Sequence, residues 1–255
     1  MYEELLAKTA DLERRLRRQE AKPTGPTLGE FYAQHLGLME LRGLWTMASV
    51  DESAAVYDLS GQGRTLTNNG PAFRAPYNDL IPYCDFTGTE YLSRPTESGL
   101  AITGALTFGG WYWLDSFGAT DLGLSGKYTA AGNQRSYLLY TNPTLPEARL
   151  IVSSDGTAIT QVNSGVALST GAWNFLVGRF TPPTELAIFA NGTKTVNTTS
   201  IPASIFSSSA AFILMGFGGA GHRDGRASLN FLSAYNQSDA LIDYLFQRGR
   251  VLFGV

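Results

Sequence analysis

The sequence of 255 residues contains a single cysteine, Cys84, and only two histidines. One cysteine cannot form an intrachain disulfide or a cysteine-based metal cluster, so we expect an apolar core to stabilise the fold. No run approaches the roughly 20 apolar residues of a membrane span, and the N-terminus lacks the apolar core of a signal peptide. We therefore expect no membrane insertion, and any release from a cell to occur without a standard secretion signal, for example by lysis or as part of a particle.

Charge is also scarce, because only 16% of the residues are Asp, Glu, Lys or Arg and the net charge is -3. Such a chain offers no broad basic surface for a phosphate backbone, so we expect no nucleic-acid partner. What is plentiful is glycine, with 28 residues, and aromatic side chains, at 12%. This balance is typical of an all-β protein that is rich in turns.

Short apolar runs separated by turn residues follow one another from residue 41 onwards. Ten such runs in about two hundred residues, with no regular alternation of strand and helix, predict a two-sheet antiparallel sandwich. A helix is predicted over Ser238–Arg248, capped by Ser238. The predicted strands lie in LRGLWTM, AAVYDLS, LIPYCDF, ALTFGGWYWL, RSYLLYT, ARLIVSS, AWNFLVGRFT, TELAIFANG, AAFILMGF and SLNFLSAYN.

The first twenty residues show a different pattern, in which Leu5, Leu12 and Leu16 follow the three-and-four spacing of a coiled-coil seam. We predict an oligomerising helix over residues 1–20 and expect a homotrimer. The alternative is a single amphipathic helix packed on the domain, because isolated helices of this length are barely stable. Two prolines and a glycine make residues 21–27 a linker. The main domain is predicted to span residues 28–255.

Four motifs follow one another along residues 41–254. They are Leu44-Trp45 with Asp58–Gly63, Leu106–Phe108 with Trp111, Gly171–Asn174 with Leu186–Gly192, and Ser228–Tyr235 with the helix after it. In this order they resemble the laminin-G-like branch of the concanavalin A-like lectin/glucanase superfamily. The resemblance implies a concanavalin A-like jelly roll, a fold that hosts lectins, glycosidases, receptor modules and structural domains alike. Relatives often have an aspartate where this chain has Asn230 and no acidic cluster surrounds it, so we expect no cofactor and the sequence does not favour a bound Ca²⁺.

Catalytic chemistry finds little support in the sequence. The glycosidases of this superfamily carry a carboxylate pair in an E-x-D-x-x-E string, and that string is absent. Asp85 and Glu90 come nearest to a pair, but carboxylates beside a turn are more often solvated turn formers. His35 and His222 are too few and too distant in sequence to indicate a metal site or a triad. We predict that the protein is not an enzyme and has no metal site.

Two segments are candidates for ligand binding. Strand alternation puts Trp111 and Trp113 on one face of a sheet, where indoles stack on sugar rings; the alternative is that both lie in the core beneath a loop or the terminal helix. The glycine-rich loop Gly216–Arg226 carries His222, Arg223 and Asp224, which suits a mobile recognition loop. Its alternative is a solvated loop held by a contact between arginine and aspartate.

These features together favour a structural protein on the surface of a virion, either decorating the capsid or associated with the tail. In this interpretation the N-terminal helix binds other copies and other virion proteins, and the lectin-like head faces outward and contacts host glycans. A free-standing carbohydrate-binding lectin is the alternative. A glycoside hydrolase with an unrecognised carboxylate pair is a remote one.

Overall fold

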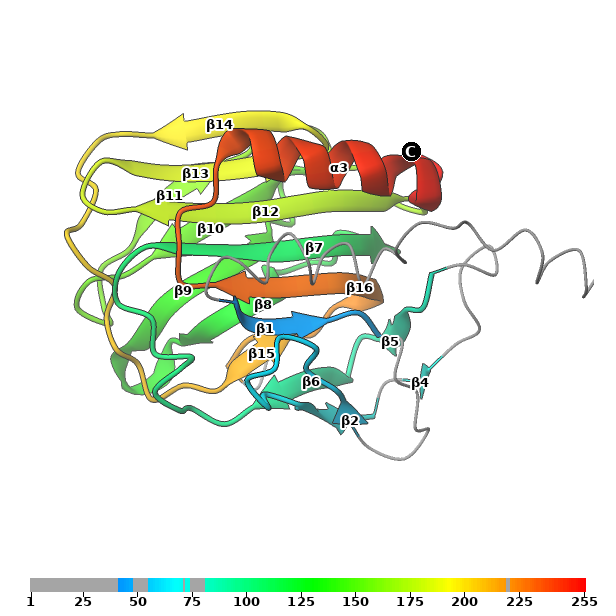
Figure 1. Cartoon of the computed structure of the whole chain (residues 1–255), viewed down its shortest axis with the longest axis horizontal. Helices are drawn as coiled ribbons and strands as arrows, with labels where there is room; N and C mark the ends of the chain where they lie inside the picture. The colour runs from blue at the N-terminus through cyan, green and yellow to red at the C-terminus, as the bar shows by residue number, and fades with distance from the viewer. Residues whose placement is uncertain (1–40, 48–54, 71, 74–80, 219–220) are drawn as a thin grey trace, which may run out of the picture.

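The computed structural model describes residues 41–47, 55–70, 72–73, 81–218 and 221–255. In these residues the chain forms two antiparallel sheets of eight strands each, with one α-helix on the outside of the first sheet (Figure 1). The predicted all-β, two-sheet sandwich is confirmed, and its arrangement is consistent with a jelly roll. The predicted helix over 1–20, the linker over 21–27 and the beginning of the domain lie outside the described residues.

Sheet A is built around β7 (Leu106–Leu114) and β16 (Asp224–Ser233), whose long pairing forms its centre. A bulge between Ser228 and Phe231 interrupts β16, and Leu229 adopts a φ of 49° there. On its other edge, β16 pairs with β5 (Cys84–Thr87) before the bulge and with β1 (Leu41–Trp45) along its second half. The strands in spatial order are β14 (Thr193–Asn197), β13 (Glu185–Ala190), β12 (Trp173–Thr181), β7 (Leu106–Leu114), β16 (Asp224–Ser233), β5 (Cys84–Thr87) and β4 (Ala72–Phe73), with β1 (Leu41–Trp45) beside β16.

Sheet B packs behind sheet A, and a short 3₁₀ helix, η1 (Ala131–Asn133), connects its two long central strands. All ten predicted apolar runs contain a strand of one sheet or the other. The strands of sheet B in spatial order are β11 (Thr160–Asn163), β10 (Ala148–Val152), β9 (Gln134–Thr141), β8 (Leu122–Thr129), β15 (Phe212–Leu214), β6 (Tyr91–Arg94), β3 (Leu66–Asn69) and β2 (Ala55–Val56).

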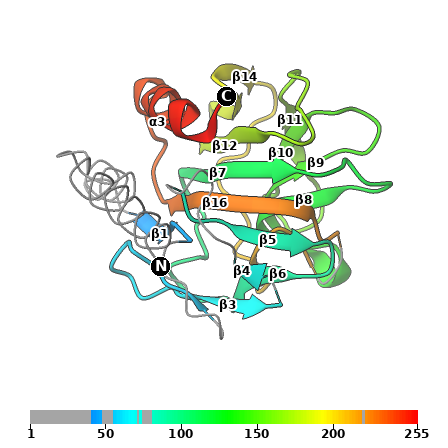
Figure 2. The ribbon, with the colours of Figure 1, turned by 90° about the vertical axis from the view of Figure 1, so that its right-hand side faces the viewer.

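The apolar side chains form two main layers because strand residues alternate between the two faces of a sheet. The larger layer fills the space between the sheets and contains Tyr112 and Tyr137. The second lies on the outer face of sheet A, beneath the helix, and contains Trp111, Trp173 and Phe175. The helix therefore adds a third layer to the two-sheet sandwich (Figure 2).

Helix α3 (Asp239–Phe253) covers this outer layer. The Ser238 hydroxyl accepts a hydrogen bond from the Leu241 amide at 3.2 Å, which confirms the predicted cap. Gly249 allows the close approach of the helix, because a Cβ there would lie 2.3 Å from the Trp111 ring. No helix in the described part of the chain is long and apolar enough to cross a membrane.

A network of charged side chains ties the start of α3 to sheet A. The Arg179 guanidinium of β12 is buried and donates hydrogen bonds to the Gln237 carbonyl and to the carboxylates of Asp239 and Glu185. Lys194 of β14 bridges the same two carboxylates, at 3.0 and 3.1 Å. Burial raises the pKa of both acids, but the hydrogen bonds from Arg179 and Lys194 outweigh it and lower the pKa of each below its ordinary value.

Candidate functional site

Trp111 lies in the layer beneath α3 and has none of its surface exposed. Its indole stacks on the Phe253 ring, with ring centres 4.2 Å apart, and packs against Phe175 and Phe246. The predicted sharing of a face by Trp111 and Trp113 is correct, but the helix covers that face at Trp111. A sugar ring cannot stack there, and the structure corrects the predicted ligand role of Trp111.

Trp113, two residues further along β7, is half-buried at the border of the same layer. The Arg226 guanidinium lies 4.8 Å from the centre of its ring, and its Nε1 donates a hydrogen bond to Asp115 Oδ1 at 3.0 Å. Arg226 is held in turn by an ion pair with Asp85, at 3.1 Å. One face of this indole is therefore already occupied by a cation of the protein itself.

The three predicted loop residues have three different environments. His222 is half-buried and stacks on the Tyr91 ring, with centres 4.6 Å apart. Arg223 has no exposed surface, and its three guanidinium nitrogens have no hydrogen-bond partner among the described residues. Asp224 is exposed and begins β16. Arg223 is thus not the surface recognition group that the sequence suggested, because the fold encloses its side chain.

Burial and neighbouring charges shift the pKa values of two residues of this loop. Desolvation lowers the pKa of Arg223 to about 10, although the negative charges of Asp224 and Asp115 act to raise it. Burial and the neighbouring carboxylates Asp115, Asp85 and Glu90 raise the pKa of Asp224 above its ordinary value. This end of the sandwich therefore has several mutually repelling carboxylates around one enclosed cation.

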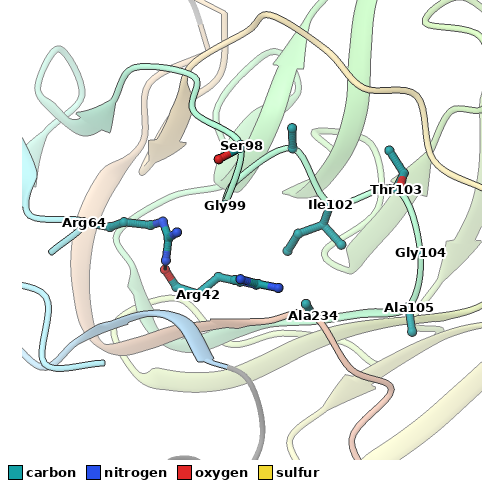
Figure 3. Close-up of a pocket in the computed structure, with 10 residues that line it drawn as sticks. Arg42, Arg64, Ser98, Gly99, Ile102, Thr103, Gly104, Ala105 and Ala234 are labelled. Atoms are coloured by element: carbon teal, nitrogen blue, oxygen red, sulfur yellow. Dashed lines mark hydrogen bonds between the residues drawn. The ribbon is translucent and has the colours of Figure 1, made fainter. Parts of the chain in front are cut away.

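The opposite end of the sandwich carries an open pocket, about 410 Å³ in volume. The nine-residue strand β7 separates the two ends by about 27 Å. Figure 3 shows the side chains of Arg42 and Arg64 on one side of the pocket and the chain before β7 on the other. The lining residues are Arg42, Arg64, Ser98, Gly99, Ala101, Ile102, Thr103, Gly104, Ala105 and Ala234.

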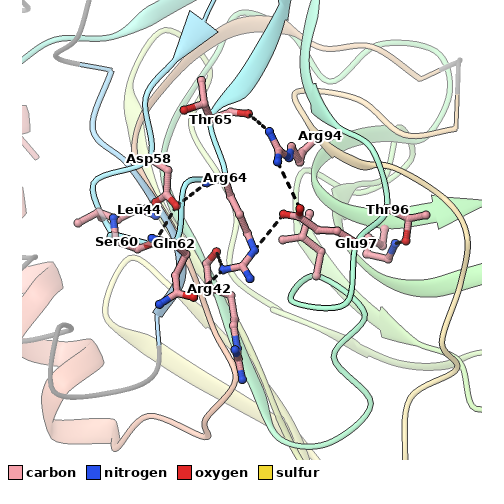
Figure 4. Close-up of polar contacts among 12 residues, drawn as sticks. Arg42, Leu44, Asp58, Ser60, Gln62, Arg64, Thr65, Arg94, Thr96 and Glu97 are labelled. Carbon is pink, nitrogen blue, oxygen red and sulfur yellow. Dashed lines mark hydrogen bonds and ion pairs between the residues drawn. The ribbon is translucent and has the colours of Figure 1, made fainter.

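The loop that presents Arg64 is organised by one carboxylate, that of Asp58. Its Oδ1 accepts hydrogen bonds from the amides of Leu44 and Ser60, at 2.9 and 2.8 Å. Its Oδ2 accepts from the Ser60 hydroxyl and the Arg64 amide, at 2.8 and 2.9 Å (Figure 4). Gly63 supplies a φ of 71°, which side chains rarely adopt. The Asp58–Gly63 motif therefore folds into a rigid turn that fixes the start of Arg64.

The Arg64 side chain is 11% exposed, and its guanidinium is held at two of its nitrogens. Its Nη1 donates to the Arg42 carbonyl at 2.9 Å, and its Nε forms a 3.0 Å ion pair with Glu97. Glu97 also pairs with Arg94 at 3.2 Å (Figure 4). The position of Gly99 requires glycine, because a Cβ there would lie 1.7 Å from Arg64 Nη2 and collide with the guanidinium. The guanidinium is thus preorganised beside the pocket.

The pocket lining has a definite chemical character. Among the residues that the structure describes, it contains two guanidinium groups, the hydroxyls of Ser98 and Thr103, and the main chain around Gly99 and Gly104, but no carboxylate and no aromatic ring. Guanidinium groups bind carboxylate, sulfate and phosphate oxygens in pairs of parallel hydrogen bonds. The arrangement therefore suits an acidic group flanked by hydroxyls better than the apolar face of a neutral sugar.

Comparison with known families agrees with this architecture. The model of the concanavalin A-like lectin/glucanases superfamily, of laminin-G type, matches residues 86–238. The chain belongs to this superfamily. Its members share the jelly-roll sandwich rather than one activity. No curated protein matches the sequence.

The solved structures that resemble this chain include binding domains of clostridial toxins. The binding domain of Paraclostridial Mosquitocidal Protein 1 is 10% identical, with a TM-score of 0.66 over 84% of this chain and 53% of that one. The ligand-binding domain of botulinum neurotoxin serotype D, in complex with N-acetylneuraminic acid, is 9% identical, with a TM-score of 0.64 over 82% and 51%. The binding domain of botulinum neurotoxin DC, in complex with rat synaptotagmin II, is 9% identical, with a TM-score of 0.62 over the same shares. The chain spans about half the length of these structures, and the likeness establishes the fold.

Because the superfamily includes glycosidases, the environments of Asp85 and Glu90, the two acids that come nearest to a catalytic pair, bear on the question of hydrolysis. Asp85 is engaged by Arg226, and Glu90 accepts hydrogen bonds from the Thr87 hydroxyl and amide, at 2.6 and 2.7 Å. Burial raises the pKa of Glu90, but hydrogen bonds from Thr87 and Thr89 prevail and lower it to about 2. A proton donor needs a raised pKa instead, so Glu90 acts here as a turn former. No group of three or more metal-ligating side chains occurs in the described residues.

The sequence did not predict the pocket lined by Arg42 and Arg64, which we call the arginine pocket. Arg42 and Arg64 are 22 positions apart and meet only because β1 and the Asp58 loop lie side by side. The available signal was the Asp58–Gly63 motif itself, which is followed immediately by Arg64. The register of β7 and β16 brings Trp113 and Asp224 to the other end of sheet A, away from this pocket.

Proposed function

We propose that this domain is a non-catalytic binding module that recognises an acidic glycan through the arginine pocket. The observation that carries the proposal is that the guanidinium groups of Arg42 and Arg64 lie on one wall of an open pocket whose lining, as far as the structure describes it, contains no carboxylate. The complex of a neurotoxin domain of the same fold with N-acetylneuraminic acid, a sugar with a carboxylate, supports an acidic sugar as the ligand. None of the described lining residues is a carboxylate, which supports binding rather than glycoside hydrolysis, a reaction that needs two.

Two substitutions test this proposal at the pocket. Arg42→Gln removes one cation, and Gly104→Asp adds a negative charge at a position where a Cβ meets open space. Because hydrogen bonds to charged groups contribute about 1.5–3 kcal/mol, each variant is expected to bind about 10- to 100-fold more weakly. Isothermal titration with N-acetylneuraminic acid, an oligomer of glucuronic acid and a sulfated oligosaccharide measures the change.

Gly104→Asn is the matched control, since it has the size of the aspartate without its charge. The asparagine variant should retain most of the affinity, and added salt should weaken binding by the wild-type protein. Equal losses in the Asp and Asn variants would show that charge is not recognised. A wild-type protein that binds none of the three acidic probes would overturn the proposed function.

We further propose that the module is the outward head of a trimeric virion projection, on the capsid or the tail. The support is the heptad spacing of Leu5, Leu12 and Leu16 ahead of a linker and a single head, since weak heads on one stalk gain avidity. Light scattering of the full chain is expected to give the mass of a trimer. The double variant Leu5→Asp, Leu12→Asp is expected to give the mass of a monomer. A wild-type monomer would contradict the projection and favour a free-standing lectin.

A further inference from the structure

A second open groove lies at the border between the two sheets, where the terminal strands β14 of sheet A and β11 of sheet B come together. Its volume is about 410 Å³, similar to that of the arginine pocket. We call it the edge groove. It is lined by Gln161, Val162, Asn163, Thr195, Val196, Asn197, Thr198 and Thr199.

Hydrogen bonds between the two sheets hold the walls of the edge groove together. Asn197 Nδ2 donates to the Gln161 carbonyl at 2.9 Å, and the Thr195 hydroxyl donates to the Ser164 carbonyl at 2.6 Å. The Thr199 amide donates to Asn197 Oδ1 at 2.8 Å, which orients that side chain. The groove is therefore preorganised rather than a loose gap between strands.

The lining of the edge groove is polar but uncharged. Six of the eight side chains that the structure describes in its lining are amides or hydroxyls, and none of the eight is ionisable. Asn163 Oδ1 is enclosed and accepts no hydrogen bond from the described residues, so a turn of its side chain toward the groove would offer this acceptor to a ligand. Val196 is 45% exposed at the groove and offers an apolar patch beside these groups. Amides that bind vicinal hydroxyls, next to an apolar contact for C–H groups, suit a neutral sugar.

The edge groove opens at the same end of the sandwich as the arginine pocket. The register of sheet A aligns Asn197 with Leu186, Leu186 with Phe180 and Phe180 with Leu106. Leu106 follows directly after the pocket residue Ala105. Five strand-to-strand steps separate β14 from β1, or about 24 Å at about 4.8 Å a step.

One segment of chain connects the two sites across this end. It leaves the groove at Thr199 and reaches the arginine pocket at Ile205, whose amide donates to the Thr103 carbonyl at 2.7 Å. Figure 1 shows the connection from β14 to β15 running along the left-hand end of the sandwich. A single extended molecule lying along this end can thus contact both sites.

We propose that the edge groove is a second carbohydrate subsite, which binds neutral sugar units of the same glycan whose acidic group enters the arginine pocket. That one glycan occupies both sites rests on the proposed function, in which the arginine pocket binds its acidic group. It divides recognition into a charged contact at Arg42 and Arg64 and a neutral contact at Asn163 and its neighbours. The ligand class is therefore an acidic heteropolysaccharide with neutral units between its acidic ones.

The test is amide chemical-shift mapping of the full-length protein with separate probes. Neutral hexasaccharides of glucose, mannose, galactose and N-acetylglucosamine are expected to shift the amides of residues 161–163 and 195–199 and to leave those of residues 98–105 unchanged. N-acetylneuraminic acid is expected to do the reverse. If no neutral probe shifts the groove amides, the edge groove proposal is wrong; if the acidic probes shift no pocket amides, the proposed function fails independently.

Variants supply a second measurement. Asn163→Ala is expected to weaken binding of the neutral probe about tenfold while leaving the affinity for N-acetylneuraminic acid within twofold of the wild type. The matched control is Gln247→Ala, which removes an exposed amide from α3, far from the groove. If Asn163→Ala, but not Gln247→Ala, lost affinity for both the neutral probe and N-acetylneuraminic acid, the variant would have a folding defect. The chemical-shift map of the wild-type protein would then show whether the edge groove binds neutral sugars.

Discussion

Replacing Trp111 with alanine is expected to lower the free energy of unfolding by about 3 to 5 kcal/mol. The indole has no exposed surface and fills the space between β7 and α3, where Phe253, Phe246 and Phe175 surround it. Removing it leaves a cavity that the helix cannot close, because the backbone of α3 already approaches the ring at Gly249. Equilibrium unfolding in urea, followed by circular dichroism, measures the change.

Trp113→Ala is the control in the same strand. This half-buried indole contacts Arg226 and Asp115, so its loss should cost only about 1 to 2 kcal/mol. Neither variant should change the affinity for N-acetylneuraminic acid, since both positions lie away from the arginine pocket. Equal destabilisation by the two substitutions would mean that α3 does not cover Trp111 as described.

Replacing Arg179 with methionine is expected to destabilise the fold by about 3 to 5 kcal/mol. The change removes the buried cation of the network and leaves the Glu185 and Asp239 carboxylates with Lys194 as their remaining cation in that network. It also removes the hydrogen bond to the Gln237 carbonyl, just before α3 begins. Because this network anchors the helix, hydrogen exchange should increase in residues 239–253 before it does in the sheets.

Lys194→Met is the matched control, as it removes a cation from the same network. The Lys194 side chain is more exposed than that of Arg179, so its loss should cost no more than about 1 kcal/mol. If the lysine variant proved as unstable as the arginine variant, the network would depend on total charge and not on the buried guanidinium.

Much of the fold could be predicted from the sequence because its central strands carry a strong apolar signal. The runs around Trp111, Phe175 and Phe231 all became long strands at the centre of sheet A. Strands β8 and β14 could not be predicted in the same way. β8 contains two glycines and the buried Lys127, and β14 is a terminal strand with mainly polar residues. Their strand character comes from pairing with neighbours distant in sequence.

The candidate site was much less predictable. Alternation in β7 correctly placed Trp111 and Trp113 on one face, but no local pattern shows which face a helix 130 residues later will cover. The loop glycines suggested an exposed Arg223, yet tertiary packing enclosed it. The pocket and the edge groove each combine segments far apart in sequence, so spacing along the chain carries no record of them.

The position of α3 at the end of the described fold has a consequence for the synthesis of the protein. Residues 239–253 leave the ribosome after every strand that the structure describes, so Trp111, Trp173 and Phe175 on the outer face of sheet A lack the cover of α3 until these residues have been synthesised. Exposed apolar patches of this kind promote aggregation of partly folded chains. The synthesis of α3 thus removes an aggregation-prone surface from the sandwich.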